Sequence, residues 1–190
     1  MSIGRLRNYV GEMTDLVGST SDEALLLDSG SQLLENLIIH DDWLPDAFAV
    51  PHPETYRQYL LHCDPQERFS VVSFVWGPGQ STPVHDHTVW GLIGIMRGRE
   101  RCEEFSDDVR PQGEHVLERG EIDRVSPTIG DVHRVTNPLE KDVSISIHVY
   151  GANIGAVRRH VFDPSRGEAS GFISGYSSEV APNLWDRSSG

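Results

Sequence analysis

Residues 79–98, GQSTPVHDHTVWGLIGIMRG, place His85 and His87 at the entry to a short apolar segment typical of a β-strand. Side chains two residues apart in a strand point to the same face, so both imidazoles can reach one metal ion. The pair alone is weak evidence, because two solvent-exposed histidines on a turn would have the same spacing. The stretch therefore predicts a strand-rich fold with a candidate metal site at a strand entry.

From Arg68 onward, the chain consists of short segments rich in Val, Ile and aromatic residues, separated by turn-forming Gly and Pro clusters. The strand candidates are FSVVSFVW (69–76), GLIGIMRG (91–98), RERCEEF (99–105), HVLERG (115–120) and DVSISIHVY (142–150). Strands that follow one another closely, with no helix between them, indicate an antiparallel sandwich or barrel rather than a parallel sheet.

The first third of the chain has a helical pattern instead. Residues 21–39, SDEALLLDSGSQLLENLII, carry apolar side chains at helical spacing after the capping candidates Ser21 and Asp22. Residues 53–62, PETYRQYLLH, predict a second helix with Pro53 in its first turn. The N-terminal region is therefore expected to be mostly helical.

These patterns predict a mainly β fold in a single domain over residues 1–190. We expect a mostly helical cap over residues 1–66, a β-sandwich barrel over residues 67–165 and a C-terminal extension over residues 166–190. The stretch from about Ser170 is rich in Gly and Ser, so part of it is expected to be a surface coil.

Composition narrows the functional classes. The chain has 29 acidic residues against 16 Lys and Arg, and its net charge of −13 argues against nucleic acid or an anionic membrane as partner. Its two cysteines, Cys63 and Cys102, are too few for a disulfide framework or a thiolate zinc cluster. Residues 1–17 lack the apolar segment and cleavage site of an export signal, so we expect a cytoplasmic protein.

Residues 127–137, PTIGDVHRVTN, place a third histidine, His133, between a Pro/Gly turn and another apolar segment. This stretch and the opening one together resemble the two sequence motifs of the cupin superfamily. The matching residues are Gly79, His85, His87 and Gly98 in the first motif and Gly130, His133 and Asn137 in the second. Pro127 lies one residue further from Gly130 than in the family pattern. The resemblance covers residues 79–137 and implies a jelly-roll-like cupin barrel with a metal held by the three histidines.

Gly91 stands where most cupins carry a glutamate ligand, four residues after His87. Three neutral imidazoles would leave a divalent ion its full charge and an open face, which suits an anionic substrate and dioxygen together. Within the cupins, such a site resembles that of the bacterial thiol dioxygenases, the family of cysteine dioxygenase and 3-mercaptopropionate dioxygenase. The resemblance implies Fe(2+) bound by His85, His87 and His133, and oxidation of a small thiol carboxylate by O2 to its sulfinic acid.

Residues 142–151, DVSISIHVYG, alternate aliphatic and polar side chains, which puts Ser146, His148 and Tyr150 on one face of a strand. An ordinary half-buried strand with a polar outside would show the same alternation. The polar row is similar to the Ser-His-Tyr relay of thiol dioxygenases, whose groups pass hydrogen bonds to one another. The animal enzymes carry a cysteine at the position of Gly91, joined to the relay tyrosine. The resemblance thus implies that Tyr150 is unmodified and that glycine leaves room beside the metal.

The resemblance also addresses the substrate carboxylate. Aligning YRQYL on the family segment places Tyr56 at a family tyrosine and Gln58 at an arginine that binds the carboxylate in cysteine dioxygenases. A neutral amide cannot supply that charged fork, so Gln58 resembles the 3-mercaptopropionate type, in which a more C-terminal arginine binds the carboxylate. We favour Arg159 for this role, with Arg158 and Arg57 as alternatives.

Other functions remain open beside 3-mercaptopropionate oxidation. L-Cysteine is the rival substrate. A cupin isomerase or a quercetinase-like dioxygenase with nickel, manganese or zinc is a second possibility, and a metal-binding sensor without catalysis is a third. The expected partners are a small thiol and O2, and the sequence does not define an oligomeric state. Five histidines outside the motifs are expected to have no role in the site: His40, His52, His62, His115 and His160.

Overall fold

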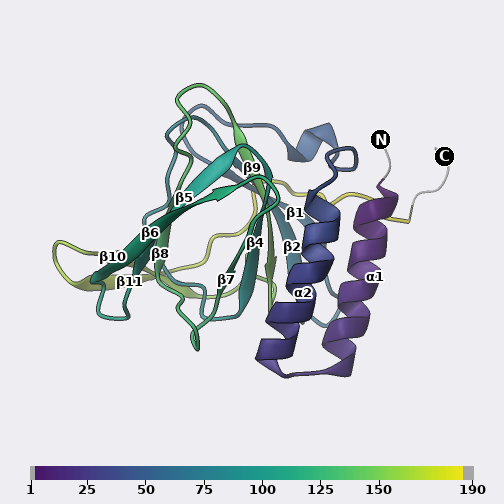
Figure 1. Ribbon diagram of the computed structural model, residues 1–190, viewed down its shortest axis with the longest axis horizontal. Coiled ribbons are helices and arrows are strands. Elements are labelled where there is room, and N and C mark those ends of the chain that lie inside the picture. The colour runs from purple at the N-terminus through teal and green to yellow at the C-terminus, as the bar shows by residue number, and fades with distance from the viewer. Residues whose placement is uncertain (1–2, 186–190) are drawn as a thin grey trace.

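The computed structural model describes residues 3–185, in which two antiparallel β-sheets face each other and two helices cover the outside of one of them (Figure 1). The first sheet has the strand order β1 (Arg57–Cys63), β2 (Ser70–Trp76), β9 (Ser144–Tyr150), β4 (Gly91–Arg97) and β7 (Ile122–Val125). The second has the order β11 (Glu168–Phe172), β10 (Arg159–Asp163), β3 (Val84–His85), β8 (His133–Thr136), β5 (Arg99–Phe105) and β6 (Pro111–Glu118). The predicted mainly β sandwich with N-terminal helices is confirmed.

The two helices are α1 (Gly4–Ser19) and α2 (Glu23–Ile38), followed by a 3₁₀ turn at Asp46–Phe48. Helix α2 begins as predicted, because the Asp22 carboxylate accepts a hydrogen bond of 3.1 Å from the backbone N of Leu25. It lies between α1 and the first sheet and packs on β4 and β7 (Figure 1). None of the helices in the described part of the chain is long and apolar enough to span a bilayer.

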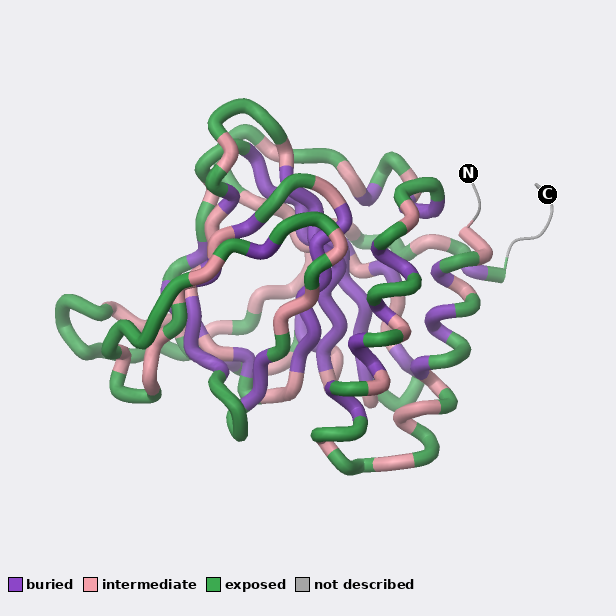
Figure 2. Tube along the Cα trace, viewed as in Figure 1, coloured by how far each residue is buried: buried purple, intermediate pink, exposed green. Residues whose placement is uncertain are grey.

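Strands β2 and β9 are buried along their whole length because both of their faces are covered. Their outward aliphatic side chains, such as Val71 and Ile147, join the core beneath the helices, whereas Phe74 and Trp76 join a second apolar cluster inside the sandwich. Figure 2 shows this burial concentrated in the sheets and on the inner faces of the helices. The interior of the sandwich is thus walled by the first sheet and supported from outside by the helices.

The predicted helix over residues 53–62 is wrong, because this segment contains most of edge strand β1. Tyr59 and Leu61 are both buried in the core beneath the helices, so the apolar positions repeat every second residue. Short apolar runs fit the helical and the strand period almost equally well. Here the segment forms a strand because it pairs with β2. Helices still make up most of the regular structure in residues 1–66, but beyond Ile38 this region contains the 3₁₀ turn and strand β1 in place of the predicted second helix.

The C-terminal extension contains more regular structure than predicted. Strand β11 pairs with β10 over the start of the expected surface coil. The chain then returns to β1, where the backbone N of Ser177 donates to the backbone O of Gln58 at 2.8 Å. The backbone N of Gln58 in turn donates to the Ser177 hydroxyl at 3.0 Å. The extension therefore covers the open end of the sandwich near β1, while residues 186–190 lie outside the described part.

Candidate metal centre and substrate pocket

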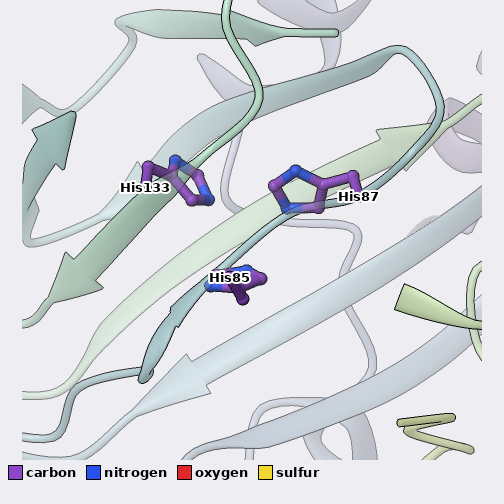
Figure 3. A group of neighbouring side chains, drawn as sticks. All are labelled: His85, His87 and His133. Carbon is purple, nitrogen blue, oxygen red and sulfur yellow. The ribbon is translucent and has the colours of Figure 1, made fainter. Parts of the chain in front are cut away.

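The three motif histidines come together inside the sandwich, as the sequence predicts (Figure 3). His85 on β3 pairs directly with His133 on β8, and His87 lies just after β3. Each histidine offers a ring nitrogen within 4.8 Å of the corresponding atoms of the other two, and all three side chains are buried. This grouping depends on two strands that lie far apart in the sequence but are neighbours in the second sheet.

Asp131 holds the His87 ring in place. One carboxylate oxygen lies 2.8 Å from His87 Nδ1, and the other accepts hydrogen bonds from the backbone N of His87 at 2.9 Å and of Thr88 at 2.7 Å. These bonds fix both the backbone and the ring of His87. Sequence reasoning missed Asp131, although it stands two residues before His133.

The other two rings also have partners at Nδ1. His85 Nδ1 lies 3.1 Å from the backbone O of Pro83, and His133 Nδ1 lies 3.5 Å from the Cys102 thiol. With Nδ1 of all three rings engaged, Nε2 of each is left to face a shared ion. This arrangement, in which the outer nitrogen is held by a neighbouring group, is typical of metal-binding histidines.

The protonation states fit a divalent cation. Burial, together with the neighbouring His87, lowers the pKa of His85 to about 3. Burial and the other two histidines hold the pKa of His133 well below its usual range. Both rings are therefore neutral at physiological pH, which is the form that binds a metal. The donor set of three imidazoles suits a transition-metal ion and leaves further coordination positions free.

A pocket of about 260 Å³ opens in front of the three histidines. Its lining includes the predicted substrate-binding residues Tyr56, Gln58 and Arg159, together with His148 and Tyr150. Apolar walls complete it, and none of the described lining residues is acidic: the remaining residues are Phe74, Trp76, Thr82, Pro83, Val135, Val161, Phe172 and Ser174. This volume lies just below the usual range for pockets that hold drug-sized ligands, so the pocket suits a small molecule.

The three polar residues of β9 form a continuous hydrogen-bonded row. Ser146 Oγ lies 2.8 Å from His148 Nε2, and His148 Nδ1 lies 2.7 Å from the Tyr150 hydroxyl. All three are buried and face the sandwich interior, so the alternative of a polar strand face exposed to solvent is wrong. Phe74 stacks on the His148 ring with centroids 4.0 Å apart, which fixes its orientation. We call Ser146, His148 and Tyr150 the relay row.

Arg159 is the arginine that the fold brings into the pocket. Its side chain is 4% exposed, its Nη2 donates to the Ser174 hydroxyl at 2.6 Å, and the guanidinium carbon lies 4.8 Å from the centre of the Phe172 ring. Its Nε has no hydrogen-bond partner among the described residues. Arg158 is exposed instead, and neither it nor Arg57 lines the pocket.

Gln58 on β1 and Tyr56 just before it line the side of the pocket opposite Arg159. The Gln58 amide Nε2 donates to the backbone O of Gly175 at 2.7 Å, so this side chain also ties the C-terminal segment to the pocket. Tyr56 packs against Trp76, with ring centroids 4.7 Å apart. Burial raises the pKa of Tyr56 above its ordinary value, which keeps its hydroxyl neutral.

Gly91 does not leave room beside the metal, contrary to the expectation. A β-carbon at this position would lie 2.9 Å from both Tyr150 Cδ1 and Val125 Cγ2. The space beside Gly91 is thus already filled by the tyrosine ring, and glycine is what allows β4 and β9 to approach so closely. The position faces Tyr150, as the comparison with the animal enzymes implies.

A second group of potential metal ligands, Cys102, His115 and Asp123, lies behind His133. Its members already have ordinary partners. The Cys102 thiol contacts His133 Nδ1, and His115 Nε2 lies 3.2 Å from Asp123 Oδ2. Cys102 was expected to be an ordinary thiol, and its contact with a motif histidine was not foreseen from the sequence.

No protein-family model matches the chain. It is 25% identical over 134 residues to cysteine dioxygenase type 1 of Danio rerio, covering 66% of this chain and 64% of the relative. It is 24% identical over 119 residues to the Bos taurus protein of the same name, covering 59% and 58%. The chain thus spans about three fifths of the length of these curated relatives.

Among solved structures, it resembles an uncharacterized protein with a double-stranded β-helix domain from Klebsiella pneumoniae (TM-score 0.48, 18% identity, 61% of this chain and 95% of that one). It also resembles a cupin 2 conserved barrel domain protein from Rhodopseudomonas palustris (TM-score 0.46, 16% identity, 60% and 74%). The chain thus forms a sandwich of two antiparallel β-sheets, and over part of its length its sequence is similar to the cysteine dioxygenases.

Proposed function

We propose that the protein is an Fe(2+)-dependent thiol dioxygenase that oxidises a small thiol carboxylate to its sulfinic acid, with 3-mercaptopropionate as its main substrate. One observation carries the proposal: three buried histidines, each with its outer nitrogen engaged, share a small pocket with the relay row and with Arg159. The similarity to cysteine dioxygenases supports the same reaction class.

In this proposal, Fe(2+) is held by His85, His87 and His133. When bound, the ion would favour the thiolate form of the substrate and supply the redox chemistry that adds both atoms of dioxygen to sulfur. The substrate sulfur gives up the electrons that reduce dioxygen, so the reaction needs no other reductant. The chain's own residues position the reactants and exclude water.

Arg159 would bind the substrate carboxylate. Its guanidinium is buried in a pocket with apolar walls, where a charge-assisted hydrogen bond is stronger than in water. Nη2 makes one hydrogen bond to Ser174 and Nε makes none with the described residues, so the guanidinium would have N–H groups left for the carboxylate. The apolar walls would then contact the methylene groups between carboxylate and sulfur.

Tyr150 would hold a hydrogen bond to the bound reactants. Burial raises the pKa of its hydroxyl above the ordinary value, although nearby Arg159 acts in the opposite direction, so the group is a neutral hydroxyl. His148 and Ser146 hold this hydroxyl in position through the two short contacts of the relay row. Tyr150 therefore serves as a fixed hydrogen-bonding group rather than as a base.

The pocket favours 3-mercaptopropionate over L-cysteine. The two substrates differ by the ammonium group of cysteine, which would need an acceptor or a carboxylate once buried. None of the described residues that line the pocket is acidic, and the pocket already contains the cation of Arg159. Burial of a second cation there would be unfavourable.

The test is to load the purified protein with Fe(2+) and to measure oxygen uptake with 3-mercaptopropionate, L-cysteine and cysteamine, identifying the products. We expect the highest kcat/KM with 3-mercaptopropionate and the corresponding sulfinate as product. A higher kcat/KM with cysteine would overturn the substrate assignment. Retention of iron without oxygen uptake on any of these thiols would favour the metal-binding sensor instead.

A further inference from the structure

Glu100 is a carboxylate that the proposed reaction leaves unused. It stands on β5 with a side chain that is fully buried between the sheets. Its Oε1 accepts a hydrogen bond of 3.1 Å from the Ser144 hydroxyl, while Oε2 has no hydrogen-bond partner among the described residues. A buried carboxylate with an unsatisfied oxygen is costly, so it requires an explanation.

Within the described part of the chain, no cationic side chain neutralises the negative charge of the Glu100 carboxylate. Arg99 and Arg101 flank it on β5 and point to the opposite strand face. The titratable groups that face it are the Cys102 thiol and, further along β9, the Tyr150 hydroxyl, and burial raises the pKa of both. Burial also raises the pKa of Glu100 itself to about 7, although the hydroxyls of Ser146 and Ser144 favour its charged form.

Ser146 connects this carboxylate with the relay row. Ser146 lies two residues after Ser144, the partner of Glu100, on the same face of β9, and its hydroxyl favours the charged form of the carboxylate. The oxygen of Ser146 lies 2.8 Å from His148 Nε2. The indole Nε1 of Trp76 donates to the same oxygen at 3.2 Å. The hydroxyl has only one proton to give, so it can donate either to Glu100 or to His148, but not to both.

The charge of Glu100 would decide between these two states. A charged carboxylate would draw the Ser146 proton toward its unpartnered Oε2, so that His148 donates from Nε2 to Ser146 and Tyr150 donates to His148 Nδ1. A neutral Glu100 instead donates to Ser146, which donates to Nε2, and His148 donates from Nδ1 to the Tyr150 oxygen. In that second state, the Tyr150 proton is free to point into the pocket.

We propose that Glu100 is the far end of the relay row and sets the direction of its hydrogen bonds, so that it determines whether Tyr150 donates or accepts a hydrogen bond in the pocket. Glu100 is thus a positioning residue that acts through Ser146 and His148. Its effect on turnover rests on the proposed thiol dioxygenase function, whereas the direction of the hydrogen bonds does not.

The direction of the row depends on pH in this scheme. Below about pH 7 Glu100 is neutral and Tyr150 donates into the pocket, and as the pH rises through about 7 this donation is lost. Any step of the reaction that needs a hydrogen bond donated by Tyr150 should therefore slow on the alkaline side of this ionisation.

The first experiment follows the tautomer of His148 and needs no turnover. The protein is labelled with ¹⁵N-histidine and loaded with Zn(II), which is diamagnetic, and the ring nitrogens are observed by NMR across the pH range around 7. The wild type should change from the Nδ1–H to the Nε2–H tautomer as the pH rises. Glu100→Gln, whose amide can still donate to Ser146, should keep the Nδ1–H form throughout. A wild-type tautomer that does not change with pH would overturn the proposal.

The second experiment compares the pH profiles of kcat for the iron-loaded wild type, Glu100→Gln and Ser144→Ala. Glu100→Gln should lose the ionisation near pH 7. Ser144→Ala removes the hydrogen bond to Oε1, so this ionisation should move to higher pH and remain present. Iron content and thermal unfolding check that each variant is folded and loaded. Profiles of Glu100→Gln and wild type that coincide would overturn the proposal.

The outcomes separate the two proposals. If the wild type oxidises no thiol, the proposed function fails, and the tautomer measurement still tests the role of Glu100. If the wild type is active and His148 keeps one tautomer, the role of Glu100 fails and the proposed function stands. Should Glu100→Gln not fold, the tautomer of the wild type and the shift caused by Ser144→Ala still decide the question.

Discussion

Asp131 shows how single residues prepare the metal centre. Its two oxygens engage the ring and the backbone of His87 and the backbone of Thr88, so the carboxylate fixes one ligand candidate before any ion arrives. The charge of this carboxylate also makes the His87 ring a better donor. Asparagine would keep at most part of these bonds and lose the charge.

Asp131→Asn should therefore weaken iron binding by roughly 10- to 100-fold. The affinity is measured by competition with a chelator. Asp64→Asn is the matched control, because Asp64 is equally buried but pairs with Arg68 away from the site. It should lower stability and leave iron affinity unchanged. Equal iron affinity in the wild type and Asp131→Asn would refute this role.

Arg159 is tested by substrates with and without a carboxylate. Loss of a charged hydrogen bond costs about 1.5–3 kcal/mol, so Arg159→Ala should lower kcat/KM for 3-mercaptopropionate by roughly 10- to 100-fold. Cysteamine, which has no carboxylate, should be spared. Arg158→Ala, at an exposed neighbouring position, is the control and should change neither value. An equal loss on both substrates after Arg159→Ala would contradict the assignment.

At the scale of elements, the close approach of β4 and β9 holds Tyr150 in place. The two strands pair with Gly91 directly opposite Tyr150, and the tyrosine ring occupies the space where a side chain at residue 91 would lie. The relay row thus depends on a glycine of the neighbouring strand as well as on the alternation within β9.

Gly91→Ala should displace the Tyr150 ring, because the added carbon would lie 2.9 Å from it. Overpacking of this kind costs about 1–3 kcal/mol, measurable by urea unfolding, and thiol oxidation should fall with it. Gly113→Ala on β6, whose new carbon would meet only Glu104 Oε2 at 3.7 Å, should do neither. Full stability and activity in Gly91→Ala would show that the ring can move aside without consequence.

Sequence patterns predicted correctly those elements in which the apolar side chains clearly follow either the helical or the strand period. The strict alternation of Ser146, His148 and Tyr150 with aliphatics predicted β9 and its polar row, and the cupin motifs predicted which histidines meet. The prediction for residues 53–62 was wrong because a short apolar run fits the helical and the strand period almost equally well. Glu100 and Asp131 could not be assigned roles, since their partners come from other strands and only pairing in the sheets brings them together.

At the scale of the whole molecule, stability at low pH depends on buried carboxylates such as Asp64. This residue closes the turn between β1 and β2, accepting hydrogen bonds from the Arg68 guanidinium at 2.9 and 2.7 Å. The hydrogen bond from Arg68 lowers the pKa of Asp64 to about 2, from 3.8. A lowered pKa in the folded state means that this contribution is complete above about pH 4 and is lost as the pH falls to about 2.

The difference in unfolding free energy between the wild type and Asp64→Asn should therefore be constant above about pH 4 and shrink as the pH falls toward 2. Urea unfolding at a series of pH values measures it. A difference that stays the same at every pH would show that the Asp64 carboxylate is not stabilised by its partners in the folded state.

The two sheets and the C-terminal segment together enclose one small pocket. Helices support the first sheet from outside, the C-terminal segment covers the open end beside Gln58, and the interior keeps a buried cation, Arg159, in a chain of net charge −13. The global charge repels anions, so binding of a thiol carboxylate must depend on this local arginine and on the metal.

The most direct test of the proposed reaction is to supply ¹⁸O₂ to the Fe(2+)-loaded protein with 3-mercaptopropionate and to analyse the product by mass spectrometry, alongside the oxygen consumed. We predict a sulfinic acid in which both oxygen atoms carry the label, formed in an amount equal to the dioxygen consumed. Disulfide, unlabelled product or a product with a single labelled oxygen would contradict the assignment as a thiol dioxygenase.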